Sequence, residues 1–393
     1  MPNRILHCIT DLSADGAQRT LLRLAAGLVA QGIENIVVTL ASAESFRTAF
    51  ESKGVCVESA GMQRNSLNIP ALLRLKSIMS HYRPDILQGW MYHGNLGAFF
   101  AGCGGSRNVP VLWNVRRCLY EQPGEKYLTR GIVKLGGFLS KRAAKVIYCT
   151  GLSAAQHEAI GYCASKTVVI PNGFDTDLFK PDPSAGPALR RLLGIDQDVP
   201  LIGIVGRYHP QKDYPTFLAA AAQVKRFRHR ARFVMVGRNV DAENGALCQL
   251  IQDSGLAQDV HLLGERSEVS KIIGGLDILC SSSANEGFSN VVAEAMASGV
   301  PCVVTDAGAS KEMVDGIGIV VARRDAEGLG EGIRTILELP ENERRALGEA
   351  GRMRIVSNYS ISKMVSRYEA LYRGMLEENQ VPASAAILPL KTA

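Results

Sequence analysis

The chain has 393 residues, more than one hydrophobic core usually organises, so its length predicts about two domains. Hydrophobic residues make up 46% of the chain and charged residues 21%, a balance that excludes a disordered protein. The net charge of +6 is uneven, because residues 1–175 hold 19 Lys and Arg against 11 Asp and Glu, whereas the remainder holds 25 against 27. We therefore expect a basic surface on the first half.

The cysteines and the hydropathy of the chain indicate the cellular compartment in which the protein is expected. The nine cysteines are scattered from Cys8 to Cys302 without a C-x-x-C pair, so they match neither a disulfide framework nor a zinc site and are expected to be reduced core residues. No window approaches the roughly 18 uninterrupted apolar residues of a membrane span, and the N-terminus lacks the apolar region of a signal peptide. We therefore expect a soluble, cytoplasmic protein.

Short β-branched runs alternate with helical periodicity, the pattern of parallel strands joined by crossover helices. Residues 180–187 (KPDPSAGP) hold three prolines and indicate a linker. The sequence thus predicts an α/β fold of two doubly wound, Rossmann-like domains, at 1–179 and 188–358, that bind ligands at the carboxyl ends of their strands. The expected strands are 4–9, 35–40, 56–58, 86–88, 111–114, 146–149 and 167–170 in the first domain, and 201–205, 232–236, 260–263, 278–281, 302–305 and 318–321 in the second.

The first strand-to-helix turn contains Gly16, which precedes a helix with Leu21, Leu24 and Leu28. A glycine at such a junction lets backbone N–H groups approach an anion at the positive end of the helix. The dinucleotide fingerprint G-x-G-x-x-G is absent. Gly16 therefore belongs either to an anion-binding loop or to a plain turn.

A histidine follows the fourth expected strand, where His93 stands in QGWMYHGN at 88–95. In this place a histidine can donate a hydrogen bond to a sugar hydroxyl across a cleft between the domains. The alternative is a structural histidine whose ring nitrogens are satisfied within the fold.

Between Glu125 and Glu158 the chain has no acidic residue, and the spacing of its basic residues places most of them on one helical face. We expect a helix over 126–145 that either presents a solvated basic face or rests on anionic lipid headgroups. The scarcity of aromatic residues argues against single-stranded nucleic acid as a partner. The basic residues are Lys126, Arg130, Lys134, Lys141, Arg142 and Lys145, and the expected core-facing stripe is Leu128, Ile132, Leu135 and Leu139.

Two cations follow the first strand of the second domain. Arg207 stands at the carboxyl end of this strand and Lys212 five residues later, in VGRYHPQKD. Two fixed cations suit a diphosphate that gains negative charge during a reaction. The alternative is a pair of solvated loop cations.

The segment EGFSNVVAEAMASGVP at 286–301 has the most specific pattern in the chain. A strand, a glycine turn and a helix follow one another, with Glu286 before the helix, Ser289 as an expected N-cap and Glu294 inside the helix. Amide donors at the helix start suit phosphate or sugar oxygens, and the two carboxylates can accept from hydroxyls. Alternatively, Glu286 is a loop acid and Glu294 lies on an exposed helix face.

In combination these segments resemble the retaining glycosyltransferases of family four, which have the GT-B fold of two facing Rossmann-like domains. The resemblance covers residues 1 to about 378 and rests on four segments in order: the Gly16 loop, IPNGFD at 170–175, Gly206-Arg207 with Lys212, and the Glu-x7-Glu pair. NVRR at 114–117 is similar to bacterial polysaccharide-assembly members. The resemblance implies that residues 359–378 form a helix crossing back to the first domain, before a tail at 379–393.

The resemblance also assigns roles. Arg207 and Lys212 match positions that hold the donor diphosphate, Glu294 the one that binds the nucleotide ribose, and Glu286 the one that contacts the donor sugar. His93 matches a histidine that faces the donor sugar, which makes His93, Arg207, Lys212 and Glu286 the expected catalytic residues. The expected donor-binding residues are Gly16, Arg207, Lys212, Glu286, Gly287, Phe288, Ser289, Asn290 and Glu294.

The function implied is transfer of a sugar, with retention, from a UDP- or GDP-sugar to a hydroxyl of a lipid-linked or oligosaccharide acceptor. The expected enzyme is of the hexosyltransferase type (EC 2.4) and works in exopolysaccharide, capsule or O-antigen synthesis, at the inner face of the cytoplasmic membrane through residues 126–145. No cofactor or metal is expected, because Arg207, Lys212 and helix amides can supply the positive field. No nucleic-acid partner is expected.

Two alternatives remain open, because fold alone does not decide the reaction. A nucleotide-sugar epimerase can share the two-domain fold, although the Glu-x7-Glu pair favours transfer. A non-catalytic sugar-binding protein would not need the complete set of cations and carboxylates.

Overall fold

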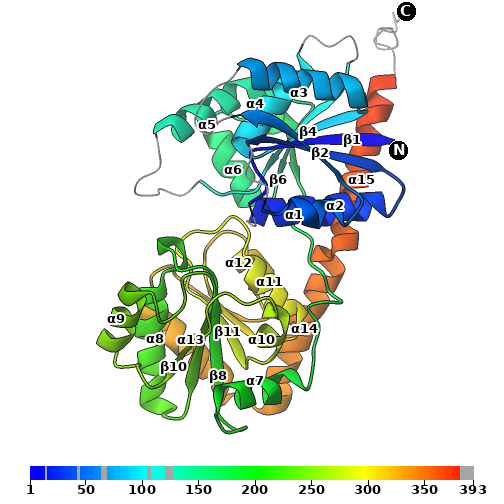
Figure 1. Cartoon of the computed structure of the whole chain (residues 1–393). Helices are drawn as coiled ribbons and strands as arrows, with labels where there is room; N and C mark the ends of the chain where they lie inside the picture. Colours follow the sequence, from blue (N-terminus) through cyan, green and yellow to red (C-terminus); the bar gives the residue numbers. More distant parts are fainter. Residues whose placement is uncertain (14–15, 42–44, 63–68, 104–107, 120–126, 381–393) are drawn as a thin grey trace, which may run out of the picture. The chain divides into compact units, whose positions relative to one another are not determined.

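The computed structural model describes residues 1–13, 16–41, 45–62, 69–103, 108–119 and 127–380. They form two compact units, one of Met1–Gly173 with the chain from Ser362 onward, and one of Phe174–Ile361 (Figure 1). Each unit contains a parallel sheet flanked by helices, so the expected α/β class is confirmed. The linker expected at 180–187 instead lies inside the second unit, where helix α7 (Ala185–Leu193) has already begun.

A seven-stranded sheet forms the centre of the first unit, in the order β3-β2-β1-β4-β5-β6-β7. All neighbouring strands are parallel, as the crossover pattern predicts. The order reverses between β1 and β4, so the loops that follow these two strands lie at the topological switch point, where open α/β sheets bind ligands. The strands are β1 Arg4–Ile9, β2 Glu34–Ala41, β3 Cys56–Met62, β4 Ile86–Trp90, β5 Val111–Val115, β6 Lys145–Tyr148 and β7 Thr167–Val169.

Helices cover both faces of this sheet (Figure 1). On one face α3 (Ile69–Tyr82) and α4 (Met91–Gly102) pack their apolar residues against β1, and α5 (Tyr127–Leu139) lies beside α4. On the other face lie α1 (Gly16–Val29) and α15 (Ile361–Gln380), and α2 (Arg47–Glu51) adjoins α1. The Tyr372 hydroxyl of α15 donates to Gln88 Oε1 of β4 at 2.6 Å. The chain thus returns to the first unit as expected, and the expected tail lies outside the described residues from 381 onward.

The segment expected as one basic helix over 126–145 is three elements, which corrects that prediction. Helix α5 ends at Leu139, a 3-10 turn follows at Ser140–Arg142, and Lys145 begins strand β6, while Lys126 lies outside the described residues. The expected core-facing stripe is wrong at Leu135, which is exposed. Gly136 lies on the buried side instead, where a Cβ atom would come within 2.3 Å of the Tyr162 hydroxyl oxygen, so a larger residue there would have to displace the buried Tyr162 side chain. Within the described residues, no helix is both long and apolar enough to cross a membrane.

The second unit contains a six-stranded parallel sheet in the order β10-β9-β8-β11-β12-β13. Here the order reverses between β8 and β11, which are hydrogen-bonded neighbours. The buried faces of β8 and β9 consist of apolar, mainly branched residues, which suits strands covered by helices on both sides. The strands are β8 Leu201–Val205, β9 Arg232–Val236, β10 Val260–Leu262, β11 Ile278–Ser281, β12 Cys302–Thr305 and β13 Ile319–Val321.

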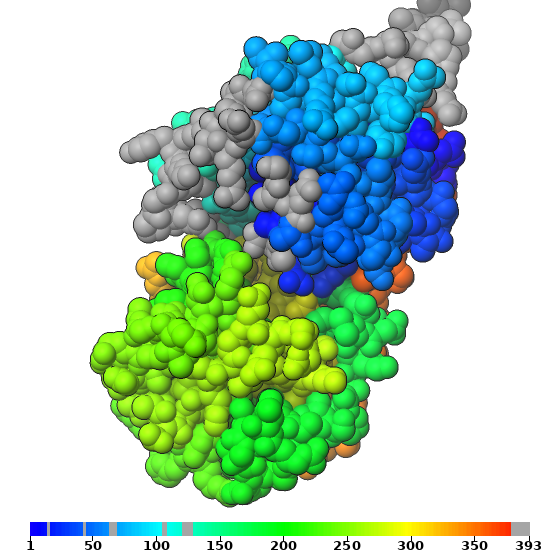
Figure 2. Space-filling view, in the orientation of Figure 1, coloured from blue at the N-terminus to red at the C-terminus, as the bar shows by residue number. Residues whose placement is uncertain are grey.

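Helices α8 (Tyr214–Phe227), α9 (Gly245–Asp253) and α13 (Ala326–Glu338) pack over one face of this sheet. Helices α10 (Val269–Gly274), α11 (Asn290–Ala297) and α14 (Glu341–Tyr359) lie on the other side, with α14 beside α11 (Figure 1). Seen in space-filling form from the same direction, little of the orange α14 is visible behind the green and yellow segments (Figure 2). The short helix α12 (Ser310–Val314) follows β12.

Candidate active site

The candidate donor residues of the second unit gather at the switch point of its sheet. Arg207 and Lys212 follow β8, whereas Glu286 follows β11, and these two strands are neighbours. Their carboxyl ends therefore meet at the place where open α/β sheets leave room for a ligand. The fold in this way joins Lys212 to a carboxylate 74 positions further along the chain.

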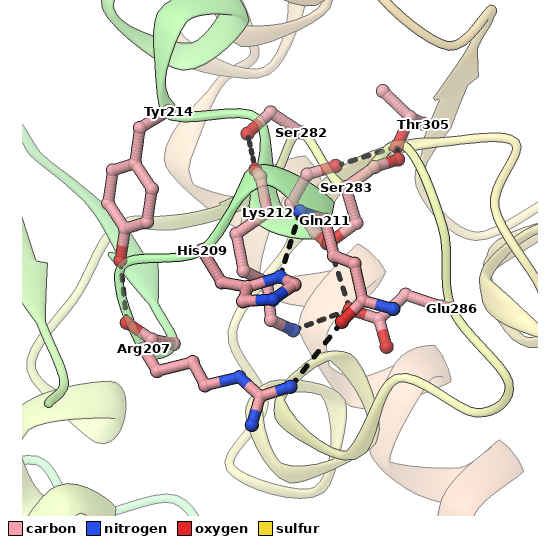
Figure 3. Close-up of polar contacts among 11 residues, drawn as sticks. Arg207, His209, Gln211, Lys212, Tyr214, Ser282, Ser283, Glu286 and Thr305 are labelled. Carbon is pink, nitrogen blue, oxygen red and sulfur yellow. Dashed lines mark hydrogen bonds and ion pairs between the residues drawn. The ribbon is translucent and has the colours of Figure 1, made fainter. Parts of the chain in front are cut away.

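Lys212 and Glu286 form an ion pair, and Figure 3 shows the two side chains pointing toward each other. The Nζ atom of Lys212 lies 2.5 Å from Oε1 of Glu286, and the Ser283 hydroxyl donates to the same oxygen at 2.9 Å. The side chains are 20% and 14% exposed, so water screens this pair less than a surface pair. A partly desolvated cation and anion thus lie side by side at the end of the sheet.

Backbone contacts hold the two loops of this pair against each other (Figure 3). The Ser282 hydroxyl donates to the carbonyl oxygen of Lys212 at 2.7 Å, and the amide of Ala284 donates to the carbonyl oxygen of Gln211 at 2.8 Å. Thr305, at the end of β12, donates from its hydroxyl to the carbonyl oxygen of Ser283 at 2.6 Å. The loops after β8, β11 and β12 therefore form one connected structure.

Arg207 extends from the same loop, and its side chain is exposed. Its Nη2 atom donates to Oε1 of Gln211 at 3.4 Å, which points the guanidinium toward the Lys212 side of the site (Figure 3). The backbone amide of Gln211 donates to Nδ1 of His209 at 3.2 Å, so the ring proton of the neutral form is on Nε2. Burial, and then the positive charges of Arg207 and Lys212, lower the pKa of His209, so this ring is neutral beside two cations at neutral pH.

Helix α11 begins next to Glu286, as the sequence predicts. Ser289 occupies the N-cap position, but its hydroxyl caps no backbone amide and has no hydrogen-bond partner among the described residues, although it is buried. Glu294 is half-buried in the second turn of the helix. Gly308, with φ of +61°, passes so close that a Cβ atom there would lie 2.4 Å from the carbonyl oxygen of Glu286. The loop after β12 therefore closes the other side of the site.

The expected donor residues Gly287, Phe288 and Asn290 lie in the same turn, between Glu286 and the start of α11. The side chain of Phe288 is 8% exposed and packs against Phe174 and Tyr359, so only its backbone is available to a ligand. The structure thus brings the expected donor residues of the second unit into one loop cluster.

Gly16 and His93 belong to the first unit, at the carboxyl ends of β1 and β4. Gly16 is the first residue of α1. After β1, Oδ1 of Asp11 accepts from the Ser13 amide at 3.1 Å and from Gln18 Nε2 of α1 at 3.2 Å. Gly16 and His93 thus both follow strands at the switch point of the first sheet, where ligands are expected.

His93 lies in the first turn of α4, and its side chain is exposed. The protein around the ring lowers its pKa by desolvation, so His93 is neutral at neutral pH and can donate from one ring nitrogen. Met91, two residues before His93, has a φ of +60°, which is unusual for a residue other than glycine, so the turn into α4 is strained close to His93.

Sequence reasoning missed the polar residues that support the site, such as Gln211, Ser282, Ser283 and Thr305. Hydroxyl and amide side chains are common near strand ends, and nothing in their spacing distinguishes those that bind a neighbouring loop. The short runs GRYHPQKD and SSSANEG contain them, but only the folded chain pairs the two loops.

Among the described residues, no group of three or more His, Cys, Asp or Glu side chains is placed to hold a metal ion. Two Asp-x-Asp pairs occur in the chain, and in each pair at least one carboxylate is bound by other groups of the second unit. Oδ1 of Asp175 accepts from the amides of Asp177 and Leu178, and Asp196 and Asp198 pair with Arg230. These acids support local structure in the second unit.

Two family models match the chain. Residues 14–178 match the model described as Glycosyltransferase Family 4, and residues 187–354 match the model described as Glycosyl transferases group 1. The first model covers most of the first unit, including the loops of Gly16 and His93. The second covers the loop cluster of Arg207, Lys212, Glu286 and Glu294.

Individual proteins are also similar to the chain. The lipopolysaccharide core biosynthesis mannosyltransferase LpsB of Rhizobium meliloti (strain 1021) is 28% identical over 247 residues, which are 61% of this chain and 68% of LpsB. The UDP-Gal:alpha-D-GlcNAc-diphosphoundecaprenol alpha-1,3-galactosyltransferase of Escherichia coli is 26% identical over 217 residues. This match spans 54% of the chain and 55% of the galactosyltransferase, about half of each protein.

The fold has close counterparts among solved structures. The crystal structure of Anabaena HepE in complex with UDP superposes with a TM-score of 0.83, covering 94% of this chain and all of HepE. The sequences are 22% identical, so this similarity identifies the fold alone. The superposition and the two parallel α/β units show that the chain has the GT-B fold. The two family models, which together match residues 14–178 and 187–354, show that the chain belongs to the family four glycosyltransferases.

Proposed function

We propose that the protein is a retaining glycosyltransferase, of the hexosyltransferase type, that transfers a sugar from a UDP- or GDP-sugar to a hydroxyl group of an acceptor. The observation that carries this proposal is the meeting of Lys212 and Glu286 at the switch point of the second sheet, with Arg207 beside them. Cleavage of a nucleotide-sugar bond leaves negative charge on a diphosphate and positive charge on the sugar. Cations and a carboxylate placed together can stabilise both charges.

In this mechanism the Lys212–Glu286 pair is the state of the site without a donor. An incoming diphosphate offers Lys212 a partner with more negative charge than a single carboxylate, and Arg207 adds a second cation. Lys212 then turns toward the phosphates, and Glu286 becomes free to accept a hydrogen bond from a sugar hydroxyl. Ser283 keeps Glu286 in position during this exchange, because its hydroxyl donates to Oε1.

We propose that the transfer needs no metal and no cofactor. Arg207, Lys212 and the amide donors at the start of α11 supply positive charge and hydrogen bonds where a divalent ion would otherwise act. His93 is proposed to face the donor sugar, where its neutral ring can donate to a hydroxyl. The Gly16 loop is proposed to hold donor oxygens from the first unit.

The experiment that tests this function is incubation of the purified protein with a panel of UDP- and GDP-sugars, with and without EDTA. Slow release of free UDP or GDP from one donor in both conditions is the expected result. An epimerase would instead produce an isomer of the donor with its diphosphate bond intact. A panel in which no donor changes would favour a binding protein, and either outcome would contradict the proposal.

The acceptor is proposed to be a lipid-linked sugar or oligosaccharide in the synthesis of bacterial surface polysaccharide. Two relatives support this choice by their names, one for lipopolysaccharide core biosynthesis and one for an acceptor linked to diphosphoundecaprenol. A lipid-linked acceptor is confined to the membrane surface. An enzyme that uses it gains encounter rate if it rests on the same surface.

We propose that α5 and the turn after it attach the protein to the inner face of the cytoplasmic membrane. Phe138 and Leu135 project from this helix with side chains 70% and 44% exposed, so the helix presents apolar surface to solvent. The exposed basic residues beside them are Arg130, Lys134, Lys141 and Arg142. Apolar side chains within a basic surface suit an anionic bilayer, which offers headgroup charge and acyl chains together.

Vesicle sedimentation tests this attachment. Replacing Arg130, Lys134, Lys141 and Arg142 by Gln is expected to weaken binding to anionic vesicles at least thirtyfold, since each Lys or Arg near the surface contributes about 1 kcal/mol and half of that sum suffices. Phe138→Ser is expected to weaken binding further at high salt, where only the apolar contact remains. The matched control replaces four exposed basic residues of the second unit by Gln: Arg191, Arg226, Arg228 and Lys271. Equal loss in the control, or equal binding to neutral vesicles, would contradict attachment through α5.

A further inference from the structure

The chain passes between its two units twice, after Gly173 and after Ile361, and the two crossings adjoin. Phe174 and Ser360 form a parallel β-bridge. The Phe174 amide donates to the Tyr359 carbonyl oxygen at 2.8 Å, and the Ile361 amide donates to the Phe174 carbonyl oxygen at 3.0 Å. Both crossings therefore begin from one hydrogen-bonded pair of residues.

The donor loop contacts this pair through Phe288, two residues after Glu286. The ring of Phe288 stacks on Phe174 with ring centres 5.7 Å apart, and it meets Tyr359 edge to face at 5.8 Å. Phe174 is fully buried, and Phe288 and Tyr359 are each 8% exposed. Close-packed aromatic rings transmit displacement, because a buried core has few voids to absorb it.

The other end of the donor helix is tied to the same crossings by Arg352 of α14. Its Nη1 atom donates to the carbonyl oxygen of Ala297, the last residue of α11, at 2.6 Å and to that of Phe179 at 3.1 Å, and Nη2 donates to that of Thr176 at 3.3 Å. A cation at the C-terminus of a helix is also favoured by the helix dipole. Thr176 and Phe179 follow the first crossing, and α14 ends at the second, so Arg352 bridges both to α11.

Helices α11 and α14 are packed closely enough to move together. Gly348 of α14 lies against Gly299, just after α11, where a Cβ atom would come within 2.0 Å of the Gly299 carbonyl oxygen. Met296 of α11 is the nearest neighbour of Gly351. The donor helix is thus connected at both ends, and along its side, to the segments that cross between the units.

We propose that Phe288 and Arg352 are positioning residues that couple occupancy of the donor loop to the two crossing segments, 173–179 and 357–362. This inference rests on the proposed function in taking a nucleoside diphosphate as the ligand and Lys212 as one of its partners. When the diphosphate draws Lys212 away from Glu286, the loop and α11 become more ordered. Through the contacts of Phe288 and Arg352, the ordered loop and helix also stabilise the Phe174–Ser360 bridge against local opening.

Hydrogen exchange with and without UDP or GDP tests the coupling. With the nucleotide at ten times its Kd, the amides of Phe174 and Ile361 are expected to exchange about tenfold more slowly in the unaltered protein, as linkage of binding to local opening requires. Phe288→Leu and Arg352→Ala are each expected to lose most of this slowing. Both are expected to keep nucleotide binding within about threefold, because the Phe288 ring is buried against two other rings and Arg352 binds backbone carbonyl oxygens. Two substitutions of different chemistry are used in case one of them prevents folding.

The matched controls are chosen within the same unit. Phe233→Leu removes a fully buried ring that packs on Phe217, in the core between the second sheet and helices α8, α9 and α13. Arg345→Ala removes an arginine of α14 whose partner Glu349 lies on the surface. Both controls are expected to keep the nucleotide-dependent slowing. With a donor sugar, Phe288→Leu and Arg352→Ala are expected to lower kcat while leaving KM within about threefold, which a loss of packing elsewhere in the unit would not reproduce.

The outcomes separate this inference from the function on which it rests. If the nucleotide binds but the crossing amides exchange at the same rate with and without it, the coupling is wrong and the proposed function stands. If the Phe288 and Arg352 variants keep the full slowing, these residues do not carry the coupling. If neither UDP nor GDP binds, the proposed function fails, and the inference fails with it.

Discussion

Arg207→Ala and Lys212→Ala are each expected to lower the turnover number for donor cleavage roughly tenfold to a hundredfold. Each substitution removes a charge-assisted contact to the leaving diphosphate, worth about 1.5 to 3 kcal/mol in the transition state. Steady-state measurement of nucleotide release gives the turnover number. Arg226→Ala, which removes an exposed cation of α8, serves as the control and is expected to behave as the unaltered protein.

The two variants are expected to differ in stability. Lys212→Ala leaves Glu286 half-buried without its cation, so the melting temperature falls, whereas Arg207 is exposed and its loss leaves the melting temperature nearly unchanged. Full turnover in both folded variants would show that the diphosphate is held elsewhere. Slower turnover in Lys212→Ala alone would restrict the assignment to the partly buried pair.

Glu294→Ala and Glu286→Ala are expected to have different effects on binding of the free nucleoside diphosphate. Glu294 is proposed to accept from the ribose, so its loss weakens binding roughly tenfold to a hundredfold. Glu286 is proposed to contact the sugar, which the free nucleotide lacks. Its removal also frees Lys212 from competition, so binding stays the same or tightens while turnover falls.

Calorimetry with UDP and GDP measures both affinities. Glu312→Ala, which removes an exposed acid of α12, is the control and is expected to leave binding and turnover unchanged. Weaker nucleotide binding in Glu286→Ala together with normal binding in Glu294→Ala would reverse the two assignments.

The strands were predictable because their composition alone identifies them. Strands covered by helices on both faces consist of apolar, mostly branched residues, and runs such as LIGIV at 201–205 and RFVMV at 232–236 have no competing interpretation. The places where the chain crosses between units were not predictable from composition. The prolines at 180–187 lie inside the second unit, before α7 and in its first turn, whereas the crossings at Phe174 and Ser360 depend on contacts between residues 186 positions apart.

The candidate site was predictable in its residues but not in its pairings. A cation after β8 and a carboxylate after β11 are visible in the sequence, and the strand order then brings Lys212 and Glu286 together. The direct ion pair between them is a tertiary contact that local spacing cannot reveal. Local spacing also cannot reveal the contacts of Phe288. The sequence places Phe288 in the donor turn, whereas its ring packs on Phe174 and Tyr359.

The basic segment illustrates how small residues alter a helical pattern. A stripe of Leu128, Ile132, Leu135 and Leu139 suggests a core-facing side, but it assumes that the largest apolar residues are the buried ones. Gly136 lies on the buried side, where Tyr162 leaves little space for a side chain, and Leu135 and Phe138 lie on the exposed side. The exposure of Leu135 and Phe138 therefore could not be predicted from the apolar stripe alone.

Calorimetric titration of UDP, GDP, UMP and GMP shows whether the loop cluster around Lys212 and Glu286 holds a nucleoside diphosphate. UDP or GDP is expected to bind at least tenfold more tightly than the corresponding monophosphate, because the second phosphate meets Arg207 and Lys212. This difference is expected to disappear when both cations are replaced by Ala. Equal affinity for the mono- and diphosphates, or a difference that survives the double replacement, would show that the diphosphate is not held by these two cations.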